Sequence, residues 1–381
     1  TAIYCSSSGI LASASLSYLI SSKRITYVFR AGRTKRLAMA SNVPTEFFYG
    51  LPQLRDAGWD VVLLEDADLG MAPPLALVAR FINRAARLFG GLPIGMAFPL
   101  FFAKHRNLLC DSGIVIATTN SLGLALGIGG MLGNIKKRVI LLGMGLLSID
   151  SGSWQRMLYR MVTRQLCLVS ISRSEQSFLS NALRQPVAYL PFGVDKDFWS
   201  PCKSDAGDYV MAIGNDRNRD WETLVNAWSV SLPPLKIVTS LPVPPGPPNV
   251  EVVRGDWRED VLSDQEIREL LCGARFVVVP LKETIQPTGQ SACLQAMACG
   301  KAVILTDISG IWDRDLIVDG QSVLLTPSRD ASALAEHARK LADDPVLADR
   351  IGAAGRKVVV EHLNSDEMAR TLEKLVEEFN D

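Results

Sequence analysis

The sequence lacks the patterns that most quickly assign a chain to a class. Its seven cysteines are scattered over 381 residues, with no CxxC pair and no Cys/His spacing of a metal site. This distribution favours a reduced, cytoplasmic protein without structural zinc. No window reaches the roughly 18 uninterrupted apolar residues of a membrane span. Histidine is scarce: there are three, and His337 and His362 lie in acidic segments where a solvated position explains them.

Acidic residues are few in the first half of the chain. Residues 1–200 carry 21 Lys and Arg against 11 Asp and Glu, whereas the remainder carries 19 against 29. One half therefore suits an anionic ligand or surface, and the alternative is two solvated domains that attract each other across a cleft. Residues 1–24 are serine-rich and are set aside as a leader: a targeting remnant, an interfacial anchor or a disordered segment.

Short apolar runs alternate with amphipathic helical patterns, as is typical of a parallel sheet covered on both faces. In the first half the predicted strands are 25–29, 59–65, 113–118, 138–143 and 167–172. In the second half they are 209–214, 235–240, 250–255, 275–281, 301–307 and 322–327. Two such series predict an α/β protein of two doubly wound, Rossmann-like domains that face each other across a cleft.

The domain boundaries follow from this pattern. The first domain is expected over residues 25–190 and the second over 202–365, with a linker at 191–201 that lets the cleft close. The prolines and glycine in residues 187–201 indicate a joint rather than another helix. Ahead of the second strand, one helix is expected over residues 44–58, because a proline opens it and a glycine ends it.

Three stretches resemble a known family. The linker GVDKDFW with its following proline, the segment LQAMACGKAVI and the tail from Ile317 to Arg356 are similar to GT-B glycosyltransferases of family 4, the glycosyl transferases group 1. The similarity extends back to residue 167, and residues 1–166 agree only in layout. It implies that the carboxyl-terminal domain binds a nucleotide sugar and the amino-terminal domain an acceptor. It also implies that a helix over 366–381 crosses back onto the first domain.

The turn at Gly289, where Gln290 and Ser291 open a helix, is the predicted anion site. A helix start exposes N–H groups without partners and carries partial positive charge, and glycine lets a phosphate approach the backbone. The alternative is a plain capping turn. In the similar family this helix start receives the diphosphate of the donor.

A second phosphate contact is expected from the loop after the strand at 209–214. The resemblance places Gly214 and Arg219 there, with Arg219 nearest the position of the family's lysine, and Arg217 and Lys282 are further candidates. Arginine binds phosphate oxygens in a fork and stabilises a leaving diphosphate. The alternative is that neighbouring aspartates pair with both arginines.

The chain departs from the family at two positions. The family holds the sugar and the ribose with two glutamates eight residues apart, and here these positions are Pro287 and Gln295. Gln295 can still bind ribose hydroxyls through its amide, whereas proline supplies no carboxylate. Glu283 is the nearest acid and is the hypothesised catalytic carboxylate, with Arg219 as its catalytic partner; the alternative is a solvated loop charge.

The loops that often carry a histidine in relatives read TNS and MGL here. This favours a retaining displacement in which a leaving phosphate oxygen takes the acceptor proton, over an inverting reaction that needs a protein base. No DxD-like pair stands out, so neither a cofactor nor an obligatory metal is expected. His105, in the basic half, is the candidate acceptor contact.

Residues 74–106 are strongly apolar, and their only charges are positive, with arginines at 80, 84 and 87. Such a segment suits a membrane interface, although buried domain helices are the alternative. A peripheral membrane protein is therefore one expectation, and a nucleic-acid partner is disfavoured because no basic-aromatic module is present.

The expected function is transfer of a hexose, with retention, from a UDP-, GDP- or ADP-linked donor to a saccharide or lipid-linked acceptor. Polysaccharide or glycolipid biosynthesis is the implied setting. Two rivals remain open. One is a non-catalytic nucleotide-sugar-binding subunit, suggested by Pro287, and the other is a different GT-B chemistry, either inverting transfer or epimerisation.

Overall fold

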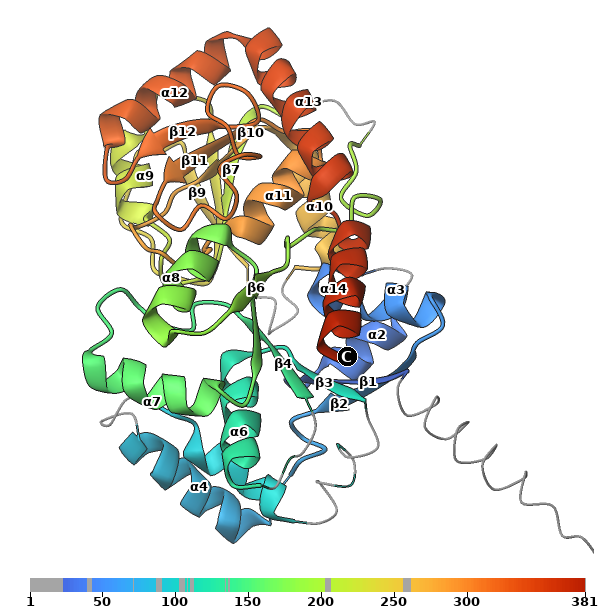
Figure 1. The fold of residues 1–381 in the computed structure, drawn as a ribbon. Coiled ribbons are helices and arrows are strands. Elements are labelled where there is room, and N and C mark those ends of the chain that lie inside the picture. Colours follow the sequence, from blue (N-terminus) through green and yellow to red (C-terminus); the bar gives the residue numbers. More distant parts are fainter. Residues whose placement is uncertain are drawn as a thin grey trace, which may run out of the picture.

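The computed structural model describes residues 23–39, 43–70, 72–86, 91–102, 107, 109, 113–133, 135, 138–202, 207–255 and 262–380. Most of the leader expected at 1–24 lies outside them. Two α/β domains are joined end to end, and the last helix returns from the second domain to the first (Figure 1).

The amino-terminal domain is a six-stranded parallel sheet in the order β2-β1-β3-β4-β5-β6. Its strands are β1 Arg24–Phe29, β2 Asp60–Glu65, β3 Ile114–Ala117, β4 Arg138–Gly143, β5 Cys167–Ser170 and β6 Val187–Tyr189. Its helices are α2 Arg33–Ala38, η1 Glu46–Phe48, α3 Leu51–Asp56, α4 Pro73–Ala86, η3 Ile94–Phe101, α6 Asn120–Met131, α7 Ser153–Thr163 and α8 Arg173–Leu183. Strand β3 is apolar throughout, and β4 is so after its first residue, Arg138, because helices cover both faces of the sheet.

The carboxyl-terminal domain repeats this plan with the strand order β12-β11-β10-β7-β8-β9. Its strands are β7 Tyr209–Ile213, β8 Leu235–Thr239, β9 Val250–Arg254, β10 Ala274–Val279, β11 Val303–Asp307 and β12 Leu324–Pro327. Its helices are α9 Trp221–Ala227, α10 Asp264–Gly273, α11 Gln290–Ala298, α12 Ala331–Asp343 and α13 Pro345–His362, and the returning helix α14 Ser365–Asn380 follows them. Every strand expected from an apolar run is confirmed.

Two local features differ from the expectation. Residues 187–189, ahead of the linker, form an edge strand that was not expected, β6, which pairs with β5 through Leu168 and Val187. The single helix expected over 44–58 is broken at Tyr49 and Gly50, which have φ of 51° and 78°. Helix α14 packs at this break, since a Cβ on Gly50 would lie 2.9 Å from the Cα of Ala369.

The chain crosses between the domains twice, and the two crossings lie side by side. Val194 of the linker donates its N–H to the carbonyl of Leu363, and Ser365 donates to the carbonyl of Val194, both at 3.0 Å. Beyond this point α14 lies on the amino-terminal domain, where Trp59 Nε1 donates to Glu373 Oε1 at 2.8 Å. The linker is thus held by backbone pairing to the start of the returning helix.

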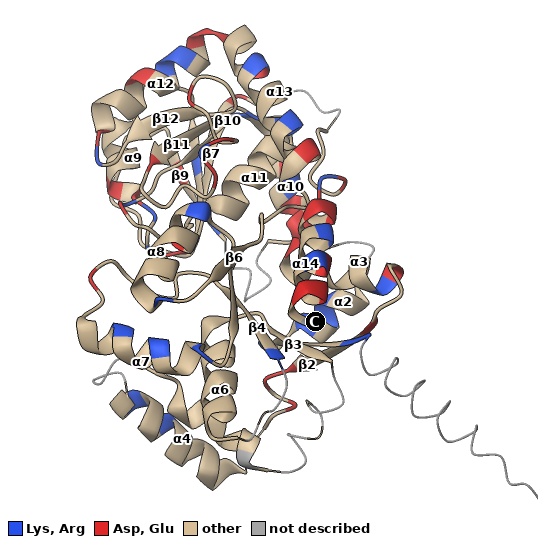
Figure 2. Cartoon of the chain, in the orientation of Figure 1, with Lys and Arg blue, Asp and Glu red and all other residues tan. Residues whose placement is uncertain are grey.

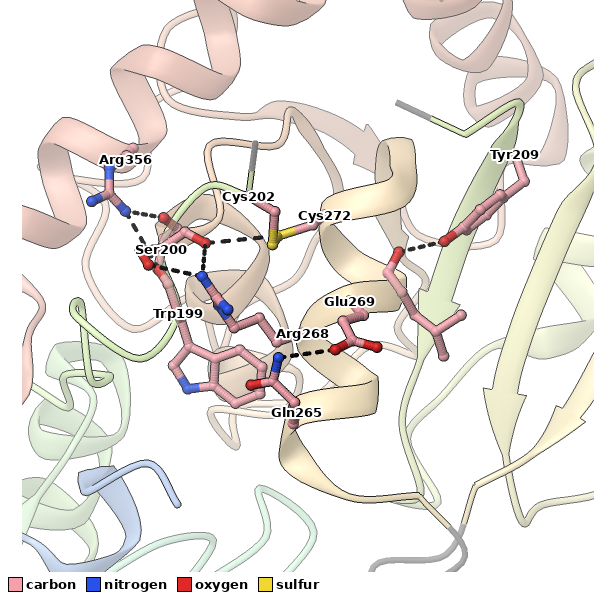
Figure 3. Close-up of a disulfide and its surroundings, with 11 residues drawn as sticks. Trp199, Ser200, Cys202, Tyr209, Gln265, Arg268, Glu269, Cys272 and Arg356 are labelled. Carbon is pink, nitrogen blue, oxygen red and sulfur yellow. Dashed lines mark hydrogen bonds between the residues drawn. A yellow bond between two sulfur atoms is a disulfide. The ribbon is translucent and has the colours of Figure 1, made fainter. Parts of the chain in front are cut away.

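A disulfide overturns the expectation of unpaired, reduced cysteines. Cys202, just after the linker, is bonded to Cys272 of α10, with the Cα atoms 5.7 Å apart (Figure 3). In the same place Arg268 Nη2 donates to the carbonyl and the hydroxyl of Ser200, at 3.2 and 3.0 Å. No local motif marks this pair, because the two cysteines stand 70 positions apart.

None of the helices in the described ranges has the length and apolar character needed to cross a membrane. Within the same ranges, no three His, Cys, Asp or Glu side chains are grouped so that they could hold a metal ion.

Candidate functional site

The turn that opens α11 is built around one glycine. Gly289 has φ 73°, in the left-handed region, and α11 begins at the next residue as expected. A Cβ at this position would lie 2.8 Å from both Arg219 Nη1 and Val279 Cγ1. Only glycine therefore fits both the backbone conformation and the close approach of the guanidinium.

Arg219 is a buried cation whose hydrogen-bonding capacity is only partly used. Its side chain is 4% exposed, and its Nε lies 3.2 Å from the carboxylate of Asp216. Within the described part of the chain, neither Nε nor Nη1 has a hydrogen-bond partner of good geometry. Burial lowers the pKa of Arg219. A guanidinium in this state favours an additional anion beside it.

A cavity of about 320 Å³ lies between the domains at this point. It draws its walls from both domains and from the linker. The lining residues are Arg33, Arg36, Phe47, Trp199, Ile213, Gly214, Asn215, Asp216, Arg219, Asp264, Ile267, Ser291, Ala292 and Gln295. The cavity therefore joins the loop after β7 and the start of α11 to the helices α2 and η1 of the amino-terminal domain.

Two arginines of the amino-terminal domain face this cavity from the other side. Arg36 Nη2 forms an ion pair with Asp264 Oδ2 at 2.5 Å, which links α2 to α10 across the domains. The Arg33 guanidinium lies over the Phe47 ring, 5.8 Å from its centroid. Burial lowers the pKa of Arg33. Positive charge thus lines both walls.

The structure brings together four of the expected donor residues. Gly214, Arg219, Ser291 and Gln295 all line the cavity. A Cβ on Gly214 would lie 1.8 Å from Arg219 Nε, so this glycine makes room for the guanidinium.

The remaining expected site residues lie elsewhere. Arg217 and Lys282 are exposed and lie outside the cavity lining. Gln290 is buried and donates to the carbonyl of Ile171 at 3.3 Å. Glu283 is exposed, and its carboxylate accepts a hydrogen bond from the Ser309 N–H at 3.0 Å. His105 lies outside the described residues.

Sequence reasoning missed two buried carboxylates. Glu46 accepts hydrogen bonds from the Trp199 indole at 2.8 Å and from Gln295 Nε2 at 3.1 Å. Glu175 accepts from the Leu146 N–H at 3.1 Å. Burial raises the pKa of both carboxyls to about 7. Nothing in the local sequence distinguishes these acids from surface acids, because their burial depends on distant segments.

The two loops in which relatives often carry histidine are tied together. Asn120 Nδ2 donates to the carbonyl of Met144 at 2.8 Å, and the Met144 N–H donates to Asn120 Oδ1 at 3.2 Å. The amide of Asn120 is therefore engaged in holding the loop after β4 and is not available as a base.

Comparison with known proteins gives concordant matches. Residues 247–344 match the model of the family Glycosyl transferases group 1. The alpha-maltose-1-phosphate synthase of Mycolicibacterium smegmatis is 29% identical over 214 residues, which are 48% of this chain and 54% of the relative. Its counterpart from Mycobacterium tuberculosis is 33% identical over 114 residues, 28% of each chain. The longer match thus spans about half the length of the Mycolicibacterium smegmatis relative.

Solved structures extend the likeness to most of the chain. Sucrose-phosphate synthase from Thermosynechococcus elongatus superposes with a TM-score of 0.67 at 17% identity, covering 93% of this chain and 98% of that one. The Anabaena protein HepE, solved in complex with UDP-glucose, gives a TM-score of 0.65 at 12% identity, covering 93% and 99%.

Two parallel six-stranded sheets, each flanked by helices, and a cavity between their domains define a GT-B fold. The expected fold class is confirmed. The resemblance to glycosyl transferases group 1 is confirmed as well, and the family model matches within the carboxyl-terminal domain.

Proposed function

We propose that this protein is a glycosyltransferase that moves a hexose from a nucleotide-diphosphate sugar to an acceptor. The observation that carries the proposal is the incompletely bonded guanidinium of Arg219 beside the Gly289 turn, inside the cavity between the domains. A leaving diphosphate would supply the missing hydrogen-bond acceptors. The arginine and the N–H groups at the start of α11 would stabilise its charge.

The relatives support this donor class. HepE, which shares the fold, was solved with UDP-glucose bound. The curated relatives are named as synthases of a sugar phosphate. The donor base and the acceptor of this chain are left to experiment.

We propose that transfer proceeds with retention. Asn120 and Met144 occupy the loops expected to supply a base, and they are bonded to each other. The acceptor hydroxyl would then lose its proton to an oxygen of the departing diphosphate. Arg219 neutralises this group without a metal in the proposed reaction.

Glu283 stays the proposed catalytic carboxylate, although it must leave its present position. Its bond to the Ser309 N–H would have to break for the carboxylate to reach the cavity. Glu283→Ala should abolish transfer but leave nucleotide binding intact. An unchanged rate would remove Glu283 from the mechanism.

The test of the proposed function has two stages. Thermal shift with UDP, GDP and ADP should show stabilisation by one of them, because ligand binding stabilises the folded state. Release of nucleoside diphosphate from the matching sugar nucleotide should follow with an acceptor, and the anomer of the product should match that of the donor. Binding without turnover would instead indicate the non-catalytic subunit, and an inverted anomer or an epimerised sugar would indicate another GT-B chemistry.

We further propose that the amino-terminal domain rests on an anionic membrane and takes a lipid-linked acceptor. Helices α4 and α7 present six large apolar side chains to solvent, each between 40% and 66% exposed. They are Leu77, Val78, Phe81, Trp154, Met157 and Met161. The charged residues of both helices are all arginines (Figure 2). The chain beyond α4 approaches α7, since a Cβ on Gly91 would lie 4.0 Å from the hydroxyl of Tyr159 in α7.

This surface can be tested with vesicles of phosphatidylcholine, with and without phosphatidylglycerol. The protein should sediment with the anionic vesicles, because apolar insertion and arginine attraction act together. Phe81→Glu and Trp154→Glu should each weaken binding. Val346→Glu is the matched control, since Val346 is 79% exposed on α13 of the other domain. Equal binding by all variants would contradict the proposal.

A further inference from the structure

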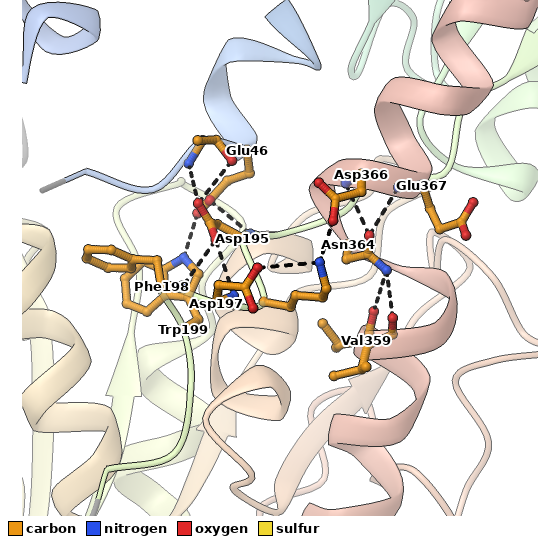
Figure 4. A network of polar contacts seen from close by, with 12 residues as sticks. Glu46, Asp195, Asp197, Phe198, Trp199, Val359, Asn364, Asp366 and Glu367 are labelled. Carbon is orange, nitrogen blue, oxygen red and sulfur yellow. Dashed lines mark hydrogen bonds and ion pairs between the residues drawn. The ribbon is translucent and has the colours of Figure 1, made fainter. Parts of the chain in front are cut away.

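Glu46 lies where three parts of the chain meet, and it is fully buried. Its Oε1 accepts hydrogen bonds from Trp199 Nε1 at 2.8 Å and from Gln295 Nε2 at 3.1 Å. Its Oε2 accepts from the Asp195 N–H at 3.2 Å (Figure 4). One carboxylate from the amino-terminal domain thus receives two donors from the linker and one from α11.

The bond to Gln295 has a chemical consequence. A primary amide can present either a donor or an acceptor to a ligand, depending on which way it is turned. Here Nε2 donates to Glu46, which above its pKa of about 7 is a carboxylate and can only accept. Gln295 lines the cavity, and no group in the described ranges donates to its Oε1. The oxygen is therefore the atom left for a ligand.

We propose that Glu46 is a positioning residue of the donor site, which turns Gln295 into an acceptor for the ribose hydroxyls of a bound nucleotide. The inference rests on the proposed function. The similar family has a glutamate at the position of Gln295, and a glutamate can only accept. Here the amide accepts in its place, and the orienting carboxylate comes from the opposite domain.

The arrangement also couples the site to the contact between domains. Glu46 follows Thr45, whose N–H and hydroxyl both donate to the Asp195 carboxylate, at 3.2 and 3.0 Å. The segment that carries Glu46 is therefore bound to the linker through Thr45 as well as through Glu46 itself. Gln295 is oriented only while this segment stays in contact with α11, so separation of the domains would free the amide to turn.

The experiment compares the dissociation constants of UDP and 2′,3′-dideoxy-UDP by calorimetry, with the GDP and ADP pairs in parallel. The wild-type protein should bind the ribonucleotide roughly tenfold more tightly, the value of one or two ribose hydrogen bonds. In Glu46→Leu no hydrogen-bond acceptor of the described residues is left for the Gln295 amide, and the preference should fall close to one. Asp197→Asn is the matched control, a linker acid whose side chain is 87% exposed, and it should keep the full preference.

A second variant separates orientation from simple destabilisation. Combining Glu46→Leu with Gln295→Glu places a carboxylate at position 295, which accepts hydrogen bonds whichever way it is turned. This pair should regain the ribonucleotide preference, whereas Gln295→Glu alone brings two buried carboxylates together and should weaken binding. A preference unchanged in Glu46→Leu, or no recovery in the double variant, overturns the inference. If no nucleoside diphosphate binds the wild-type protein, the proposed function itself is contradicted, and not only the role of Glu46.

Discussion

Gly145 of the amino-terminal domain lies against Gln286 of the carboxyl-terminal domain. A Cβ at position 145 would stand 2.8 Å from Gln286 Cδ, and Gly145 has φ +65°. The first loop follows β4 and the second lies between β10 and α11, so both extend from the carboxyl ends of central strands, where open α/β sheets bind their ligands. The contact brings the loop before the predicted anion site against the opposite domain.

Gly145→Ala should therefore disturb the contact between domains. The left-handed φ alone should cost about 1 kcal/mol of unfolding free energy. The added methyl should also displace Gln286 and lower the transfer rate. Gly133→Ala is the control, because Gly133 has φ +71° and nothing described within 4 Å of the added Cβ. Denaturant unfolding and transfer assays check both. Equal rates in the two variants would mean that the contact has no functional role.

Arg219→Ala should weaken nucleoside diphosphate binding by roughly tenfold to a hundredfold, the range expected for losing a charge-assisted hydrogen bond. Arg219→Lys should recover only part of it, because an ammonium lacks the guanidinium fork. Arg217→Ala is the comparison, since that side chain is exposed and lies outside the cavity lining. Calorimetry measures all three. Equal losses in Arg217→Ala and Arg219→Ala would contradict the assignment of Arg219.

Glu175→Gln should change how stability depends on pH. Burial raises the pKa of Glu175 from 4.5 to about 7, so the folded state holds the proton more tightly than the unfolded chain. This contribution is fully present below about pH 4.5 and is lost as the pH rises through about 7. Across this window the wild-type protein should lose roughly 3 kcal/mol relative to the variant.

Denaturant unfolding from pH 4 to pH 8 checks this difference. Glu336→Gln is the control, because Glu336 is exposed on α12, and it should keep the wild-type pH dependence. Parallel curves for the wild-type protein and Glu175→Gln would show that the carboxyl titrates alike in the folded and unfolded states.

Reduction of the Cys202–Cys272 disulfide should destabilise the carboxyl-terminal domain. The bridge spans 70 positions, and a loop of that length corresponds to about 4 kcal/mol in the chain-entropy model. Dithiothreitol should therefore lower the unfolding temperature of the wild-type protein but leave that of Cys202→Ser with Cys272→Ser unchanged. Cys167→Ser, which alters a free cysteine, should respond to the reductant like the wild-type protein. Peptide mapping without reduction that finds only free thiols would contradict the bridge.

The strands and the turn at Gly289 could be predicted because their signals are local. A buried parallel strand needs a short apolar run. The start of α11 needs a glycine, because the chain turns there and the Arg219 guanidinium approaches the backbone. Arg219 could be assigned to the same place by resemblance to the family. Glu283 could only be chosen as the nearest acid in sequence, and its carboxylate proved to be bound to Ser309.

The missed features depend on contacts between distant segments. The helix break at Gly50 reflects the approach of Ala369, and the strand β6 exists because β5 offers an edge to pair with. The linkage of Cys202 to Cys272 likewise requires α10 to lie beside the end of the linker. Neither periodicity nor spacing along the chain carries information about such neighbours.

The order of amino acids was enough to specify two βαβ series, a joint between them and the helix start after Gly289, because each depends on a few consecutive side chains. The partners of those groups were decided by how the two domains and the returning helix pack. Glu46 and Gln295 stand 249 positions apart and meet at 3.1 Å. A buried carboxylate can orient an amide only after packing has removed water from both.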